Sequence, residues 1–331
     1  MPSLPKPRLR RSARARADGA HPAPSAEPNV EIVTSSGLRW INIERPGPVD
    51  RAWLEEHFDF HPLDYEDVLS RNQRPKIDEY EDYLFIVLYF PVFDKQVGRL
   101  NAAELDIFIG PDFLITLPNQ PIPPVEYLFE RCRTGEELRD SLFSKGSGSL
   151  LYKIVDDSFD YCFPMLRKIG NRLERLEEDI FEGRSEEVVR DISSSKQEII
   201  NFRKIIRPQR AVLRDLERTK QRYLADDLEV YFDDIVDASE RIWDMLENFK
   251  EVVEALEDTN ESVISHRVNE VLRVLTTFSV VILPLTLFAS VFGMNVKFPF
   301  EGSVAAFWGI VAGMIVLLAG MVAYFRRRGF L

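Results

Sequence analysis

Two long apolar runs without a single charge lie near the end of the chain. Residues 274–296 contain no Asp, Glu, Lys or Arg, and residues 302–325 contain none either. A helix needs about 20 residues to cross a hydrocarbon core of roughly 30 Å, so each run is long enough. A buried helical hairpin of a soluble protein is the alternative, but two such runs in succession disfavour it. We expect spans at about 272–292 and 305–325, within a membrane domain of residues 271–331.

The segment before these runs, residues 149–270, has a helical pattern with many charges, and we expect it to form a cytoplasmic stalk. The pattern breaks near Gly183, and Pro208 is expected to kink or interrupt its helix. No proline occurs between Asp226 and Pro284, which predicts one very long helix that continues into the first span. At about 1.5 Å per residue this helix would reach about 100 Å, so it needs neighbouring helices or further copies of itself.

Residues 30–148 show strand patterns instead. The stretch LRWINI (38–43) alternates as a strand does, and YLFIVLYF (83–90) is a continuous apolar run typical of a buried strand. The stretch LDIFIGPDFLITL (105–117) contains two such runs around a Gly-Pro-Asp turn, which predicts a hairpin. Charged helical stretches lie between and after these strands, so we expect a compact, soluble α/β domain.

Residues 1–29 are rich in Pro, Ala and Arg, and they lack the apolar residues needed to fold. No apolar segment of the kind found in a secretory signal follows the basic residues. We therefore expect a disordered basic tail in the cytoplasm. An alternative role is a tether to anionic lipid, worth about 1 kcal/mol for each basic residue near the membrane surface.

The charge of the chain narrows the possible partners. It has 54 acidic and 42 basic residues, a formal net charge of −12, which argues against a general nucleic-acid binder. An acidic balance suits a protein that handles cations, although a soluble acidic protein would look the same. Cys132 and Cys162 form no CxxC motif, which gives no support to a disulfide framework or a structural zinc site. No Gly-rich phosphate loop, nucleophile elbow or catalytic triad is found, so we expect neither an enzyme nor an organic cofactor.

Acidic residues recur on one face of the long helix at alternating steps of four and three. They are Glu240, Asp244, Glu247, Glu251, Glu254, Asp258 and Glu261. Such a face is either solvated, or paired with the basic residues of the segment 196–222, or placed to concentrate cations at the inner end of a pore.

The same spacing continues in phase into the first span. The positions are Ser265, Asn269, Leu272, Leu275, Ser279, Leu283, Thr286 and Ser290. A lipid-facing helix gains nothing from aligned hydroxyl groups, which serve either helix contacts or a narrow water path. Because one helix cannot enclose a pore, the chain is expected to oligomerise around this face.

Basic residues predict the orientation of the spans. Arg326, Arg327 and Arg328 follow the second span, whereas the link between the spans carries only Lys297 and Glu301. By the positive-inside rule the C-terminus is cytoplasmic, and two spans return the N-terminal body to the cytoplasm as well. The turn with the sequence Gly-Met-Asn then faces outside.

The first span and its end carry a resemblance to a known family. The stretch VLRVLTTFSVVILPLTLFASVFGMN, followed by a second span and a basic end, resembles the CorA family of magnesium/cobalt transport proteins, of the 2-TM-GxN superfamily. Further stretches that resemble CorA are RPKIDEYEDYLFIVL (74–88), LLYKIVDDSFDYCFPML (150–166), YFDDIVDA (231–238) and SHRVNEVLRVLT (265–276). The similarity covers about residues 35–331.

The resemblance implies both a fold and a function. The fold is an α+β cytoplasmic domain with α/β/α layers, followed by a long helical stalk and two transmembrane helices, assembled as a homopentameric funnel. The function is influx of Mg²⁺, and also of Co²⁺ and Ni²⁺, driven by the membrane potential across the plasma (inner) membrane and gated by intracellular Mg²⁺. Mg²⁺ is then both substrate and regulatory ligand, and membrane lipid surrounds the spans.

The resemblance also implies functional residues. The selectivity filter is Gly293, Met294 and Asn295. A ring of amides can hydrogen-bond to the water shell of Mg²⁺, an ion that dehydrates reluctantly; Gly293 lets the backbone turn and Met294 packs the turn. Together with the stripe described above, it predicts these pore-lining residues: Asn269, Leu272, Leu275, Ser279, Leu283, Thr286 and Ser290. Asp258 would form an inner acidic ring, and Asp94 of one subunit with Asp234 of its neighbour would hold regulatory Mg²⁺.

Several positions depart from the family pattern and leave the substrate open. Phe292 replaces a common tyrosine, Ser290 a common glycine and Lys297 a common acid, and FPFEG (298–302) replaces the usual Met-Pro-Glu-Leu loop. One alternative is a Zn²⁺ transporter of the ZntB type, although that group typically carries Gly-Ile-Asn. The alternative from another class is a membrane-anchored sensor or scaffold that conducts no ion.

Overall fold

A six-stranded sheet organises the N-terminal part of the computed structural model, which describes residues 27–70, 73–94, 99–182, 185–219, 229–294 and 303–328. The strand order is β1-β2-β6-β5-β4-β3. β2 and β6 are parallel, and all other neighbouring strands are antiparallel. The strands are β1 Glu31–Ser35, β2 Leu38–Asn42, β3 Lys76–Glu79, β4 Leu84–Asp94, β5 Arg99–Ile109 and β6 Phe113–Pro118.

The predicted hairpin joins β5 and β6. The Gly110 N–H donates to the Phe113 carbonyl at 3.0 Å, which closes the turn. A Cβ atom at Gly110 would lie 2.4 Å from the Phe113 ring, so only glycine fits this close approach. The strands predicted at 38–43, 83–90 and 105–117 are thereby confirmed, with β4 and β5 longer than the apolar runs alone indicate.

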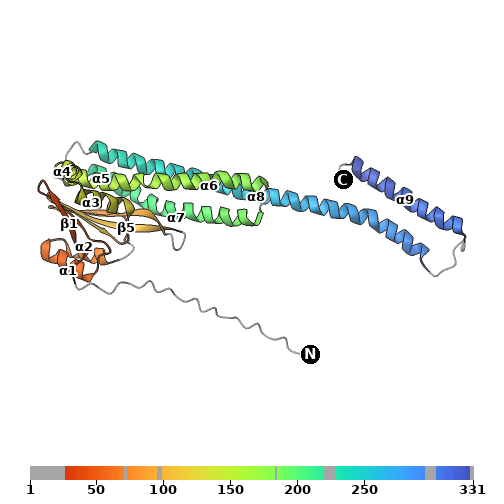
Figure 1. Cartoon of the computed structure of the whole chain (residues 1–331), viewed down its shortest axis with the longest axis horizontal. Helices are drawn as coiled ribbons and strands as arrows, with labels where there is room; N and C mark the ends of the chain where they lie inside the picture. The colour runs from red at the N-terminus through yellow and green to blue at the C-terminus, as the bar shows by residue number, and fades with distance from the viewer. Residues whose placement is uncertain are drawn as a thin grey trace, which may run out of the picture. The chain divides into compact units, whose positions relative to one another are not determined.

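Helices cover both faces of the sheet (Figure 1). On one face, Leu54 of α1 and Val68 of α2 share a buried cluster with Phe108 of β5. On the other face, Trp40 meets Phe129 of α3 edge to face, with ring centroids 4.9 Å apart. The covering helices are α1 Pro48–His57, α2 Pro62–Leu69, α3 Pro123–Thr134, α4 Glu136–Phe143 and α5 Ser147–Asp160. Because both faces are covered, β6 is buried along its whole length, and the α/β/α layering is confirmed.

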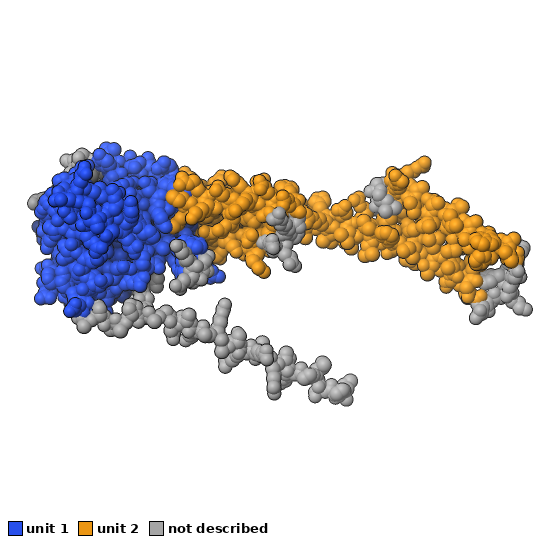
Figure 2. All heavy atoms as spheres, in the orientation of Figure 1, with its two compact units in different colours: residues 1–163, 202–243 blue, residues 164–201, 244–331 orange. Residues whose placement is uncertain are grey.

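Four long helices follow. They are α6 Cys162–Glu182, α7 Ser185–Arg218, α8 Glu229–Phe292 and α9 Val304–Arg327. The predicted break near Gly183 lies between α6 and α7, and the predicted long helix is α8, which has 64 residues. The chain divides into two compact units, residues 1–163 with 202–243 and residues 164–201 with 244–331 (Figure 2).

Pro208 lies inside α7 and does not interrupt it. Interruption was one of the two expected outcomes, and a kink was the other. Hydrogen bonds attach α7 to the sheet within the helical turn that contains this proline. Gln209 is fully buried and exchanges two hydrogen bonds with the backbone of Tyr89, with lengths of 2.8 and 2.6 Å. Ile206 and Leu213 are buried on the same helix. Tertiary anchoring on both sides of the proline thus offsets the one backbone hydrogen bond that it removes.

Helices α8 and α9 each contain a stretch long and apolar enough to cross a membrane, with a mean hydropathy of 2.1 in both. Only 6% of the stretch in α8 and 0% of the stretch in α9 is buried within the chain. The apolar side chains therefore need lipid or further copies of the chain to cover them.

Candidate ion pathway

The helix end that precedes the predicted filter is well defined. α8 ends at Phe292, and the Gly293 N–H continues the helical pattern by donating to the Ala289 carbonyl at 2.9 Å. Gly293 does not adopt a positive φ, and its expected role in letting the backbone turn stays a prediction. A Cβ atom there would lie 3.1 Å from the Ala289 oxygen, which gives a different reason for glycine. Met294 is 56% exposed, and its packing against the turn stays a prediction. Asn295 lies outside the described residues.

The seven predicted pore-lining residues of α8 are all exposed in the single chain. The buried positions of this segment are Thr277 and Val281, at 3% and 8% exposure. Two residues turn an α-helix by about 200°, so Thr277 and Val281 lie on the side opposite Ser279 and Leu283. The predicted stripe therefore faces away from the covered side of α8, where other copies of the chain can reach it.

The hydroxyl groups of the stripe are oriented by their own helix. Ser279 Oγ donates to the Leu275 carbonyl at 2.9 Å, and Thr286 Oγ1 donates to the Ile282 carbonyl at 3.0 Å. Each hydroxyl proton is thus used within the helix, and the oxygen lone pairs remain as acceptors. An acceptor is the group that the outward-pointing protons of a hydrated cation require.

The acidic stripe of α8 is partly paired and partly open. Arg210 and Arg214 of α7 both donate to Glu240, Arg214 at 2.5 Å. Asp258, the predicted inner acidic ring, is exposed and makes no ion pair within the described part of the chain. Pairing with the basic segment therefore accounts for the start of the stripe, whereas Asp258 remains open to solvent or cations.

The two predicted regulatory carboxylates lie on different elements of the chain. Asp94 ends β4 and accepts a hydrogen bond from Asn101 at 3.4 Å, and Asp234 lies on an exposed position of α8. Sequence reasoning missed two acids beside Asp234. Burial raises the pKa of Tyr152, and the charges of Asp156, Asp234 and Asp160 raise it further against the opposing charge of Lys153, so these three carboxylates lie near one phenol. The helical spacing of Tyr152, Asp156 and Asp160 was the available signal.

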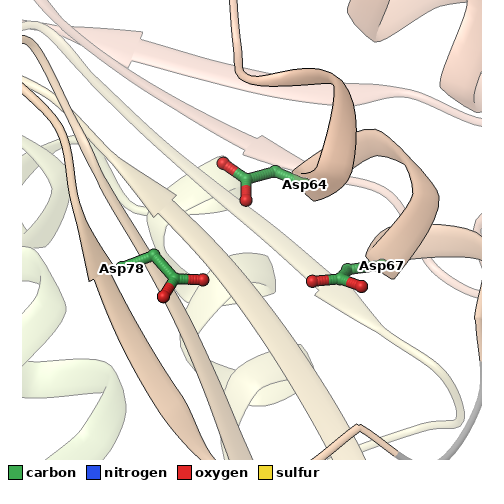
Figure 3. Close-up of side chains that lie close together, drawn as sticks. All are labelled: Asp64, Asp67 and Asp78. Atoms are coloured by element: carbon green, nitrogen blue, oxygen red, sulfur yellow. The ribbon is translucent and has the colours of Figure 1, made fainter.

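A further carboxylate group, Asp64, Asp67 and Asp78, comes together between α2 and β3 (Figure 3), with oxygens within 4.8 Å of one another. The Lys76 ammonium binds Asp67 at 2.7 Å and Asp78 at 2.5 Å. Tyr83 donates to Asp64 at 2.8 Å. Because donors of the chain already satisfy these oxygens, the group acts as an ion-pair network that fastens α2 to the sheet.

Comparison with known proteins identifies the family of the chain. The sequence profile described as CorA-like Mg²⁺ transporter protein matches residues 35–327. The chain belongs to the CorA-like Mg²⁺ transporter family. Family members are transporters and not enzymes, which agrees with the lack of catalytic motifs. The CorA resemblance of the sequence is thereby confirmed, and α8 and α9 are the membrane helices of a transporter of this family.

Individual relatives support the same assignment. The cobalt/magnesium transport protein CorA of Thermotoga maritima is 32% identical over 303 residues, covering 90% of this chain and 84% of its own. The complete structure of the CorA magnesium transporter from Methanocaldococcus jannaschii aligns with a TM-score of 0.79 at 23% identity, covering 89% and 92%. The ZntB cytoplasmic domain from Vibrio parahaemolyticus aligns with a TM-score of 0.60 at 18% identity, covering 69% and 88%. The fold of the N-terminal part is therefore shared by proteins named CorA and by a protein named ZntB.

Proposed function

We propose that the chain forms a channel for the influx of Mg²⁺, with Co²⁺ and Ni²⁺ as further substrates, driven by the membrane potential. The observation that carries this proposal is the position of the Gly-Met-Asn sequence directly after the exposed, hydroxyl-bearing face of α8. Met294 favours this substrate range over the Zn²⁺ alternative, in which isoleucine is typical at that position.

The chemistry of the stripe suits a hydrated ion. Mg²⁺ holds its waters at about 2.0–2.1 Å and releases them slowly, so a fast pathway keeps the inner water shell. Those waters point their protons outward and need acceptors. Ser279, Thr286 and the side-chain carbonyl of Asn295 supply neutral acceptors, which bind weakly enough for conduction. Leu275 and Leu283 on the same face narrow the path with apolar rings that block it when they lose water.

The assembly is a homopentamer with both termini in the cytoplasm of a plasma (inner) membrane. The exposed stripe of α8 suits contacts with further copies of the chain, and the resemblance to CorA gives the number five. The three arginines after α9 favour the cytoplasmic side for the C-terminus. The five Asp258 side chains then form one ring at the cytoplasmic end of the pathway, where they raise the local concentration of cations.

Intracellular Mg²⁺ closes this channel by bridging Asp94 of one subunit and Asp234 of its neighbour. Asp160 adds negative charge near Asp234, whereas Lys153 pairs with Asp156 at 3.3 Å and offsets part of its charge. Without the ion, these like charges repel one another and destabilise the closed arrangement.

Ion flux into proteoliposomes tests the function. Wild type should take up Mg²⁺, and Asn295→Ala should lose at least about 90% of the uptake, since each subunit loses a filter acceptor. Asn248→Ala is the matched control, because Asn248 is an exposed residue of α8 outside the candidate span. Co²⁺ and Zn²⁺ serve as competitors in the same assay.

The outcomes separate the alternatives. Zn²⁺ flux without Mg²⁺ flux would replace the proposal with a ZntB-type transporter. No flux of any ion, from protein shown to be folded and oligomeric, would favour a membrane-anchored sensor or scaffold.

A further inference from the structure

An open pocket of about 620 Å³ lies between helices α3, α4 and α5. Leu128, Leu138 and Leu142 form an apolar wall. Two tyrosines also line the pocket, and Tyr127 and Tyr161 remain 66% and 38% exposed. The volume is within the range of sites that hold a small organic ligand, roughly 300–1,000 Å³. None of these residues belongs to the ion pathway.

The pocket is cationic although the chain as a whole is acidic. Arg131, Lys145 and Lys153 line it, against the single carboxylate of Asp157. Lys153 is neutralised by Asp157 at 2.8 Å. Neither Arg131 nor Lys145 pairs with a carboxylate in the part of the chain that the structure describes. In a chain with a formal net charge of −12, two such cations beside an apolar pocket indicate an anionic ligand.

The aromatic residues define the rest of the ligand. The Arg131 guanidinium lies 5.6 Å from the centre of the Tyr127 ring, so an aromatic face and a charge are presented together. An exposed tyrosine ring stacks well with a flat heterocycle, whatever the base. A purely apolar ligand would leave the cations without partners, and an inorganic anion would leave the tyrosine faces and the leucine wall in water.

We propose that this pocket binds a nucleoside polyphosphate. The base stacks on Tyr127 or Tyr161 over the leucine wall, and the phosphates bind Arg131 and Lys145. Guanidinium groups suit phosphate because they donate paired hydrogen bonds in the geometry of its oxygens, and an ammonium adds a compact charge.

Calorimetric titration of the full-length protein in detergent, in metal-free buffer with EDTA, tests the proposal. The probes are ATP, adenosine and inorganic tripolyphosphate. We expect ATP to bind at least about tenfold more tightly than either of the others, because only ATP uses both halves of the pocket. Equal affinity for ATP and tripolyphosphate would reduce the site to an anion site, and no binding of ATP would overturn the proposal. The assay measures binding and does not depend on transport. Its result is therefore independent of the proposed function.

Variants locate the site. Arg131→Gln and Lys145→Gln should each weaken ATP binding about tenfold, whereas Tyr127→Ala should weaken ATP binding and leave tripolyphosphate binding unchanged. Lys204→Gln removes the same charge from an exposed position of α7 and should bind ATP as wild type does. Equal weakening by Lys204→Gln would show non-specific attraction and contradict the proposal. Unchanged thermal unfolding of each variant confirms that its fold is intact.

Discussion

Asp106 of β5 is buried, and its Oδ1 atom has no hydrogen-bond partner among the described residues. Burial raises the pKa of Asp106 well above its ordinary value of 3.8, and the charges of Glu104 and Asp67 raise it further against the opposing charge of Lys76. Folding therefore favours the neutral carboxyl. A group of this kind contributes stability at low pH, and that contribution is lost as pH rises from the ordinary pKa through the raised one.

Asp106→Asn should accordingly stabilise the protein at high pH relative to wild type. The variant keeps the shape of the side chain and removes the buried charge. The difference in unfolding free energy should be smallest at low pH and should grow to about 1–3 kcal/mol above the raised pKa. Thermal unfolding of the full-length protein in detergent, followed from pH 4 to pH 9, measures this difference.

The control for this prediction is Asp82→Asn. Asp82 is an exposed residue, so its substitution should leave the pH dependence of unfolding as it is in wild type. Parallel pH profiles for wild type and Asp106→Asn would mean that the pKa of Asp106 is the same in the folded and unfolded states, and would contradict the prediction.

At the scale of the element, α8 offers two threonines on opposite sides of one helix. Both donate their hydroxyl protons to a carbonyl four residues earlier, Thr286 to Ile282 and Thr277 to Arg273. Thr286 is exposed on the predicted stripe, and Thr277 is buried on the covered side. Thr→Val removes the hydroxyl and keeps the shape in each case, which makes the two substitutions a matched pair.

Thr286→Val should reduce Mg²⁺ flux about fivefold to tenfold, because each subunit loses an acceptor worth about 1 kcal/mol to a hydrated ion. Thr277→Val should leave flux unchanged, since its oxygen does not face the path. Flux is measured in proteoliposomes with protein of confirmed assembly. Full activity of Thr286→Val would place Thr286 at a helix contact instead of the water path.

Patterns that repeat along a single element could be read from the sequence. The long helix α8, the hairpin at Gly110 and the apolar strand β4 all depend on local periodicity or on one turn residue. The parallel pairing of β2 with β6 could not be read, because it joins residues more than 70 positions apart. The continuity of α7 through Pro208 was equally hidden, since it rests on Gln209 reaching the backbone of Tyr89.

Only part of the candidate site could likewise be predicted from the sequence. Its stripe on α8 follows from helical spacing alone. The acids Asp156 and Asp160 were missed because only the fold brings α5 and α8 together around Tyr152. The group of Asp64, Asp67 and Asp78 was missed for the same reason, as α2 and β3 meet only in the folded domain.

At the scale of the whole molecule, the proposed regulation combines carboxylates from two subunits. Among the described residues, the single group of three acids close enough to share an ion is the Lys76-neutralised one, and it contains neither Asp94 nor Asp234. The proposed regulatory site, with Asp94 of one subunit and Asp234 of its neighbour, would be completed by a second subunit. Its loss should change the response to internal Mg²⁺ and leave the pathway intact.

Asp94→Asn combined with Asp234→Asn should raise the internal Mg²⁺ concentration needed for half-block of influx by about tenfold. The amides keep the size of the side chains but cannot hold a divalent cation by charge, so the closed form loses its bridging ion. Influx is measured in liposomes loaded with increasing Mg²⁺. Asp82→Asn combined with Asp191→Asn removes two exposed charges elsewhere and should keep the wild-type block.

The level of influx without internal Mg²⁺ separates regulation from conduction. If the two carboxylates act only on the gate, wild type and the Asp94/Asp234 variant should conduct equally when internal Mg²⁺ is absent, and differ only as it rises. An unchanged block would remove both residues from the regulatory site and direct attention to Asp156 and Asp160. A loss of influx at all Mg²⁺ levels would mean instead that the two acids hold the subunits together, which size-exclusion chromatography of the same variant would reveal.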